Sequence, residues 1–229
     1  MTRGRVERVE RHAARLRRDA ERLGLVLPDP RTLETVILES ARDAFGRGDG
    51  VVRVEWSRDR EGDPVPTLSV STRALGPEPE TWRAATVSVV HPGPGDRHNT
   101  KHVDIPSLAA ARAERDAAGV DEVLLYDAED RLVEGSRTNL LVVSASGRLE
   151  TPDPAFGAVE GLGLTILRER VAACTGARIT RDDVADAREL LAINAVRGVV
   201  PIVELDGKPV ADGQPGRWAR RLLPLFGHV

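Results

Sequence analysis

Two lysines stand out in this chain, because Lys101 and Lys208 are the only lysines among its 33 basic residues. A lysine amine with a lowered pKa can attack an aldehyde and form a Schiff base, whereas an arginine guanidinium cannot. Lys208 lies in a predicted hairpin turn, residues 206–209, where an exposed amine stays an ordinary cation. Lys101 follows a stretch rich in proline and glycine. We therefore predict Lys101 as a nucleophile whose amine faces an enclosed cleft, with an ordinary surface cation as the alternative.

A carboxylate at the mouth of a turn is the second candidate. Glu134 begins the polar segment 134–138, which lies between two strand-like stretches. A carboxylate in this position could face the nitrogen of a pyridine ring and keep it protonated, which makes the ring an electron sink. A turn acceptor and a surface charge are the alternative roles for Glu134.

A candidate anion site precedes the predicted helix over residues 164–174. Gly161 and Gly163 permit close approach to the backbone, and free N–H groups at a helix start attract phosphate. Arg15, on the polar side of the first predicted helix, could pair with the same anion. Glycines before a helix are common, however, and a solvated helix face is the alternative for Arg15.

Charge and composition exclude several classes of partner. The formal net charge is -3 and the pI is near 6.0, which gives no attraction to nucleic acid or to an anionic membrane. No apolar run approaches the roughly 20 residues that a membrane span needs. A single cysteine, Cys174, excludes an intramolecular disulfide, and the five histidines lack metal-ligand spacing. We predict a cytoplasmic protein with a small-molecule partner and no metal.

The elements that would position these residues mix helical and strand-like patterns, which favours an α+β or α/β fold. Helices are predicted over residues 6–25, 33–46, 105–118, 162–174 and 216–226. Strands are predicted over residues 51–57, 67–73, 84–91, 122–126, 139–143 and 199–205. Residues 91–96 contain two prolines and two glycines, which is typical of a stiff connection. We therefore predict a small lobe over residues 1–92 and a larger lobe over residues 93–229.

Taken in order, these segments resemble the class IV family of pyridoxal-phosphate enzymes. That family includes branched-chain aminotransferases, D-amino-acid aminotransferases and aminodeoxychorismate lyases. The resemblance extends over essentially the whole chain. Its most specific part is the pairing of Lys101 with the run Glu134-Gly135-Ser136-Arg137-Thr138-Asn139-Leu140. The other matching stretches are residues 12–16, 119–125, 161–162 and 194–201.

The resemblance implies an α+β fold of two lobes, a small α/β lobe and a larger lobe with a barrel-like sheet, with pyridoxal 5′-phosphate in the cleft between them. It implies Lys101 as the Schiff-base lysine and proton carrier, and Glu134 as the partner of the pyridine nitrogen. The other cofactor-binding residues that it implies are Arg15, Asn139, Leu162, Gly163, Asn194 and Ala195. The expected protein is a homodimer that acts on an amino acid and a 2-oxo acid.

The chain departs from the family pattern at three places. Only residues 1–5 precede the first predicted helix, where members carry further strands. We therefore expect either an incomplete small lobe or a native start further upstream. Gly163 and Leu164 replace a usual threonine and arginine, and the lost hydroxyl contact would weaken phosphate binding by about 1–3 kcal/mol. Ile105 and Pro106 stand where some members carry a tyrosine.

Two alternatives to transamination stay open. The run Asn-Ala-Val-Arg-Gly at residues 194–198 leans toward 4-amino-4-deoxychorismate lyase, which uses the same lysine and cofactor to release pyruvate and 4-aminobenzoate. The short N-terminal segment and Leu164 would also suit a catalytically impaired homologue. Arg53 and Arg58, on or near a predicted strand of the small lobe, are candidates to bind a substrate carboxylate.

Overall fold

The computed structural model describes residues 6–58, 66–97, 99–103 and 105–226, so the five residues before the first predicted helix lie outside the described residues. The chain divides into two compact units, Met1–Glu78 and Pro79–Val229. Among the described helices, none is long and apolar enough to cross a membrane.

The first unit, as far as it is described, packs two helices with a two-stranded antiparallel sheet. Its elements are α1 (Val9–Arg22), α2 (Pro30–Phe45), β1 (Gly50–Ser57) and β2 (Thr67–Ala74). Helix α2 begins where the Asp29 carboxylate accepts a hydrogen bond from the Thr32 N–H at 2.7 Å, with Pro30 in the first turn. Leu33 and Ile37, one helical turn apart, then bury against the sheet and α1.

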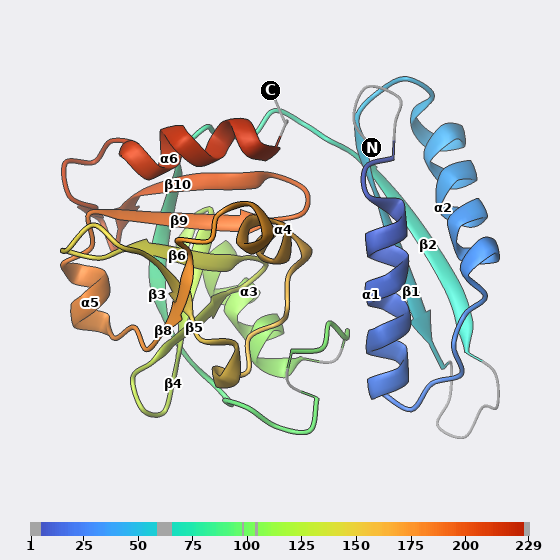
Figure 1. Ribbon diagram of the computed structural model, residues 1–229, viewed down its shortest axis with the longest axis horizontal. Helices are drawn as coiled ribbons and strands as arrows, with labels where there is room; N and C mark the ends of the chain where they lie inside the picture. Colours follow the sequence, from blue (N-terminus) through green and yellow to red (C-terminus); the bar gives the residue numbers. More distant parts are fainter. Residues whose placement is uncertain (1–5, 59–65, 98, 104, 227–229) are drawn as a thin grey trace. The chain divides into compact units, whose positions relative to one another are not determined.

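The second unit is built, in the residues that can be described, on a nine-stranded sheet that curls on itself (Figure 1). The strand order is β5-β4-β3-β10-β9-β6-β7-β8, and β11 pairs with β10 outside this path. The strands are β3 (Trp82–His91), β4 (Glu122–Asp127), β5 (Leu132–Gly135), β6 (Asn139–Val143), β7 (Leu149–Pro152), β8 (Thr175–Ala177), β9 (Glu189–Asn194), β10 (Gly198–Leu205) and β11 (Lys208–Pro209). The helices are α3 (Pro106–Ala118), α4 (Leu162–Arg170), α5 (Arg181–Ala185) and α6 (Arg217–Leu222), with short 3₁₀ turns η1 (Pro154–Phe156) and η2 (Leu223–Phe226).

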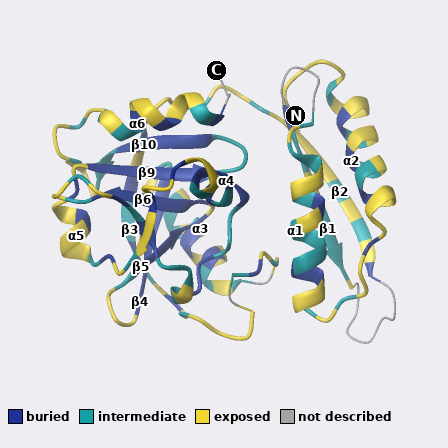
Figure 2. Cartoon of the chain, viewed as in Figure 1, coloured by how far each residue is buried: buried dark blue, intermediate teal, exposed yellow. Residues whose placement is uncertain are grey.

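The core of this unit is organised by alternation along the strands, because successive side chains point to opposite faces of a sheet. In β6, Leu140 and Val142 join a cluster shared with β4, β9 and β10 on one face of the sheet. Their neighbours Leu141 and Val143 pack instead with α4 and α6. Both faces are therefore covered, and the central strands are buried along their length (Figure 2).

The predicted division after residue 92 differs from the division in the structure, which falls between Glu78 and Pro79. The physical reason is the pairing of β3, which lies in parallel between β4 and β10. Trp82 and Ala84 of this strand are buried in the core of the second unit. The proline- and glycine-rich stretch after His91 is consequently a connection from β3 toward α3 within one unit, not a link between lobes.

Candidate active site

The loop that joins β7 to α4, residues 153–161, is contacted by two of the predicted site residues, Glu134 and Asn139. We call it the β7–α4 loop. Gly157 has φ 98°, and a Cβ at this position would lie 2.6 Å from the carbonyl oxygen of Gly93. Glycine is required for both the backbone conformation and the close approach. The Arg131 guanidinium lies 4.5 Å from the ring centroid of Phe156 and holds the loop from another side.

The segment that carries Lys101 is tied to this loop through Asn99. With its amide oriented toward acceptors, the Asn99 side chain donates hydrogen bonds to the carbonyl oxygens of Pro154 and Ala158, at 3.0 and 2.7 Å. The Asn99 carbonyl accepts a hydrogen bond from the Glu160 N–H at 3.4 Å. The Lys101 side chain itself is exposed. The backbone of this segment therefore lies at the loop, and the enclosure of the amine stays a prediction.

Glu134 lies on β5 and is buried, with 3% of its surface exposed. Its Oε2 accepts a hydrogen bond from the Val159 N–H at 3.1 Å, and its Oε1 lies 3.3 Å from Nε2 of His91. Burial removes the surface-charge alternative for Glu134. His91 had no predicted role, although a histidine that ends a strand just before a proline- and glycine-rich connection was a usable signal.

Asn139 binds the same residue of the loop as Glu134 does. Its Nδ2 donates a hydrogen bond to the Val159 carbonyl oxygen at 2.9 Å. Glu134 therefore accepts a hydrogen bond from the N–H of Val159, and Asn139 donates one to its C=O. A Cβ at Gly161 would lie 2.1 Å from Oδ1 of Asn139, so glycine is required before α4 for this contact to form.

Glu122 shapes the turn between β5 and β6, and sequence reasoning assigned it no role. It is 0% exposed, and its carboxylate accepts hydrogen bonds from the Ser136 N–H at 2.8 Å, the Ser136 hydroxyl at 2.6 Å and the Thr138 hydroxyl at 2.8 Å. Gly135 leaves space for this network, because a Cβ there would lie 2.5 Å from the Thr138 hydroxyl oxygen. In the sequence, an acidic residue at the start of an otherwise apolar strand could have indicated this structural role.

The start of α4 and the turn after β9 together form a candidate anion site. No side-chain hydrogen bond caps the helix at Gly161, so no capping side chain competes for the N–H groups of Leu162 and Gly163. A Cβ at Gly163 would lie 2.8 Å from the carbonyl carbon of Asn194, which places the helix start against the Asn194–Ala195 turn. Oδ1 of Asn194 accepts hydrogen bonds from the N–H groups two and three residues further on, at 2.9 and 2.8 Å. A helix start of this kind favours a phosphate.

The arginines predicted to take part from the first unit have partners inside that unit. Nε of Arg15 lies 3.8 Å from Oδ2 of Asp19, one helical turn further on. Arg53 pairs with Glu55 at 3.2 Å, and Arg58 donates a hydrogen bond to a backbone carbonyl at 3.1 Å. The roles expected for these arginines, phosphate binding by Arg15 and substrate binding by Arg53 and Arg58, stay predictions.

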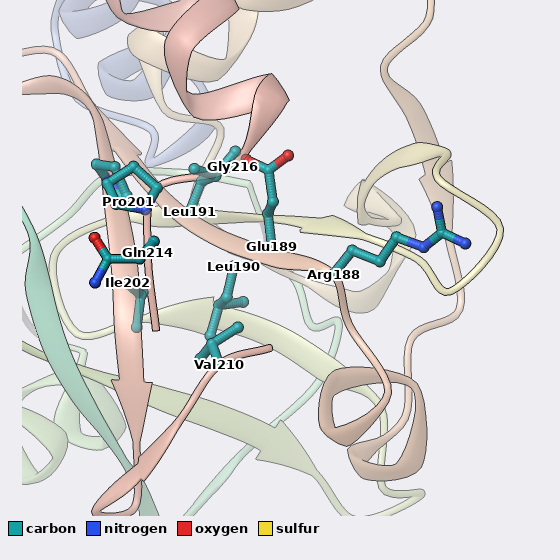
Figure 3. A pocket seen from close by; sticks show the side chains of 10 residues that line it. Arg188, Glu189, Leu190, Leu191, Pro201, Ile202, Val210, Gln214 and Gly216 are labelled. Atoms are coloured by element: carbon teal, nitrogen blue, oxygen red, sulfur yellow. The ribbon is translucent and has the colours of Figure 1, made fainter. Parts of the chain in front are cut away.

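A small pocket opens elsewhere in the second unit, along β9, β10 and the segment before α6 (Figure 3). Its volume is about 10 Å³, which is about the space that one water molecule needs. Glu189 lines it, and the Glu189 carboxylate already accepts hydrogen bonds from the N–H groups of Trp218 and Ala219 at 2.8 and 2.9 Å. The pocket contains none of the predicted site residues and is too small for a cofactor.

Comparison with known proteins identifies the class. The model of the class IV amino-transferase family matches residues 1–205. A putative branched-chain-amino-acid aminotransferase of Methanocaldococcus jannaschii is 27% identical over 209 residues, which cover 86% of this chain and 71% of that protein. The structure of 4-amino-4-deoxychorismate lyase from Pseudomonas aeruginosa is 26% identical, with a TM-score of 0.82 over 98% of this chain and 86% of that chain. An aminotransferase of Brucella abortus, solved with the cofactor PLP, is 21% identical, with a TM-score of 0.82 over 99% of this chain and 85% of that chain.

The family match covers most of the chain, and the chain belongs to the class IV aminotransferase family. The protein is an enzyme of this family. The resemblance drawn from the Lys101 and Glu134 motifs is confirmed. The predicted α+β fold with a barrel-like sheet is confirmed as well, since the curled sheet matches these solved structures.

Proposed function

We propose that this chain is a pyridoxal-phosphate-dependent aminotransferase that transfers an amino group between an amino acid and a 2-oxo acid. The observation that carries the proposal is the convergence on the β7–α4 loop. Glu134 and Asn139 bind Val159 of this loop. Asn99 anchors the segment of Lys101 to the loop, and α4 begins at its end. Family membership supports the same reading.

The side chains and backbone groups along this loop fit the two ends of pyridoxal phosphate. An ionised carboxylate offers about four acceptor positions. In the described chain Glu134 accepts a hydrogen bond from Val159 and lies beside His91, which leaves acceptor capacity for a pyridinium N–H. The N–H groups of Leu162 and Gly163, with the Asn194–Ala195 turn beside them, suit a phosphate. The end of the loop around Val159 would therefore meet the ring, and the start of α4 that follows it would meet the phosphate.

The residues would divide the chemistry as follows. When bound, pyridoxal phosphate supplies an aldehyde that an amine captures and a ring that withdraws electrons from the substrate Cα. Lys101 would hold the aldehyde end, and after the substrate amine has displaced it, its released neutral Nζ would take the proton from the substrate Cα. Glu134 would keep the proton on the ring nitrogen. Arg15 would add a guanidinium to the phosphate site, and Arg53 or Arg58 would receive a substrate carboxylate.

We further propose a homodimer located in the cytoplasm. One cysteine provides no intramolecular disulfide, which suits a reducing compartment. The dimer follows from the family pattern, and sedimentation at micromolar concentration would measure it directly: a monomer under those conditions would count against it.

The second candidate function is 4-amino-4-deoxychorismate lyase. The Asn-Ala-Val-Arg-Gly run at residues 194–198 favours it, and so does the likeness to the lyase structure at 26% identity. A third hypothesis, a catalytically impaired homologue, is favoured by Leu164, which stands where the family usually has an arginine.

The experiment that separates these readings begins with cofactor binding. Purified protein incubated with excess pyridoxal phosphate should show an absorbance band near the visible edge that borohydride abolishes. Lys101→Ala should lack the band, and Lys208→Ala, the matched control at the other lysine, should keep it. A colourless wild-type protein would support the impaired homologue. If the band is present, supplying D-alanine, branched-chain amino acids or aminodeoxychorismate decides between transaminase and lyase by the product released.

A further inference from the structure

Two buried polar side chains, His91 and Glu134, lie side by side at the candidate active site. His91 ends β3 and is 4% exposed, while Glu134 on β5 is 3% exposed. Strand β4 separates the two strands in the sheet, yet Nε2 of His91 lies 3.3 Å from Oε1 of Glu134. Buried polar side chains usually have a polar partner, because water does not reach them.

The surroundings of His91 fix which ring nitrogen carries the proton. The Gly93 N–H donates a hydrogen bond to Nδ1 of His91 at 3.0 Å. Nδ1 must therefore present a lone pair, and a neutral ring then carries its proton on Nε2. Nε2, which carries the hydrogen in this tautomer, lies 3.3 Å from Oε1 of Glu134, so the histidine is the partner able to donate and the carboxylate the partner able to accept.

Glu134 has two neighbours from different parts of the fold. Oε1 lies 3.3 Å from Nε2 of His91, and Oε2 accepts a hydrogen bond from the Val159 N–H at 3.1 Å. Contacts from two segments limit the rotation of the carboxylate. Acceptor capacity remains on both oxygens for one further donor.

We propose that His91 is a positioning residue that acts through Glu134: it orients the carboxylate so that its remaining lone pair meets the ring N–H of the cofactor. The inference rests on the proposed function, in which Glu134 binds the pyridine nitrogen. The Gly93 contact serves the same end, because it sets the tautomer in which His91 can donate. His91 itself touches neither substrate nor cofactor in this scheme.

Two matched substitutions separate positioning from general support of the fold. In His91→Gln the amide nitrogen can reach the place of Nε2 and donate to Glu134. In His91→Asn the shorter amide reaches only as far as Nδ1, so the donation to Glu134 is lost while the residue stays polar. Thermal unfolding of both apoproteins shows whether they fold.

The assay is equilibrium binding to apoprotein of two ligands, pyridoxal phosphate and a carbocyclic analogue in which CH replaces the ring nitrogen. His91→Asn should weaken binding of pyridoxal phosphate by about ten-fold, which is the size of one hydrogen bond to a charged group. It should change binding of the analogue little, because the analogue has no ring N–H for Glu134 to accept. His91→Gln should bind both ligands as the wild type does. Equal weakening of both ligands, or no difference between the two variants, would overturn the proposal.

Failure of the inference can be told apart from failure of the proposed function. If wild-type protein binds neither ligand, the cofactor assignment itself fails. A measurement on the unmodified protein covers the case in which His91→Asn does not fold. Nitrogen-15 spectra of the imidazole rings, with His91 assigned by its loss in His91→Gln among the five histidines, should place the proton on Nε2. A proton on Nδ1 would overturn the proposal without any binding data.

Discussion

Replacement of Glu122 by leucine tests quantitatively how the turn between β5 and β6 is held. The Glu122 carboxylate accepts four hydrogen bonds, from the N–H groups of Val123 and Ser136 and from the hydroxyls of Ser136 and Thr138. The residue is 0% exposed, so water does not reach the donors that leucine would leave behind. Each buried donor without a partner costs about 1–3 kcal/mol. We therefore expect Glu122→Leu to lower the free energy of unfolding by about 4 kcal/mol or more.

The matched control is Glu122→Gln. Glutamine keeps one acceptor oxygen for the Ser136 groups, and its amide nitrogen can donate to the Thr138 hydroxyl, so the expected loss is about 1–2 kcal/mol. Urea unfolding followed by circular dichroism, with a common slope for the three proteins, measures both values. If Glu122→Leu unfolds at the same urea concentration as the wild type, the carboxylate does not hold this turn and the reasoning is refuted.

Three further predictions concern the loop, the thiol and a buried carboxylate. Gly157→Ala should lower both stability and cofactor affinity, because its Cβ would lie 2.6 Å from a backbone oxygen at φ 98°. Gly207→Ala, also at positive φ but with nothing within 4 Å, is its control, and equal urea midpoints for the two variants would contradict this reading. Burial raises the pKa of Cys174 to about 11, so a thiol reagent at about pH 8 should modify it only after unfolding; rapid reaction of native protein would disprove its burial. Burial also raises the pKa of Asp127, but hydrogen bonds from Arg131 outweigh this effect and leave the pKa below its ordinary value. Its contribution to stability is therefore complete above about pH 4 and is lost as the pH falls through the lower folded value. Asp127→Asn should flatten the fall in Tm over that acidic range, and an unchanged profile would count against the prediction.

The strands were predictable one by one, but the sheet that each one joins was not. Period-two alternation over residues 84–91 predicted a strand that the structure contains as β3. Its partners lie in β4 and in β10, the latter more than a hundred residues further along the chain. Alternation gives the two faces of a strand and carries no information on its neighbours. The predicted lobe boundary was placed after β3 for that reason.

The site was predictable where a residue's type and order were informative. Lys101, Glu134 and Asn139 were predicted in this way, and their roles stay predictions. His91 and Glu122 were not, because their roles depend on contacts across the sheet that residue type does not reveal. The enclosure of the Lys101 amine was predicted from the chemistry of a Schiff base. The exposure of a side chain depends on which distant segments pack around it, and residue type does not reveal these segments.

We expect the amine at position 101 to capture the cofactor, and trapping the adduct on the protein tests this. The protein is treated with pyridoxal phosphate, reduced with borohydride and digested, and the modified peptide is identified by mass spectrometry. Because the chain has two lysines, the result is unambiguous between them. We predict modification at Lys101 with Lys208 unmodified; modification at Lys208 alone, or to the same extent at both, would contradict the account.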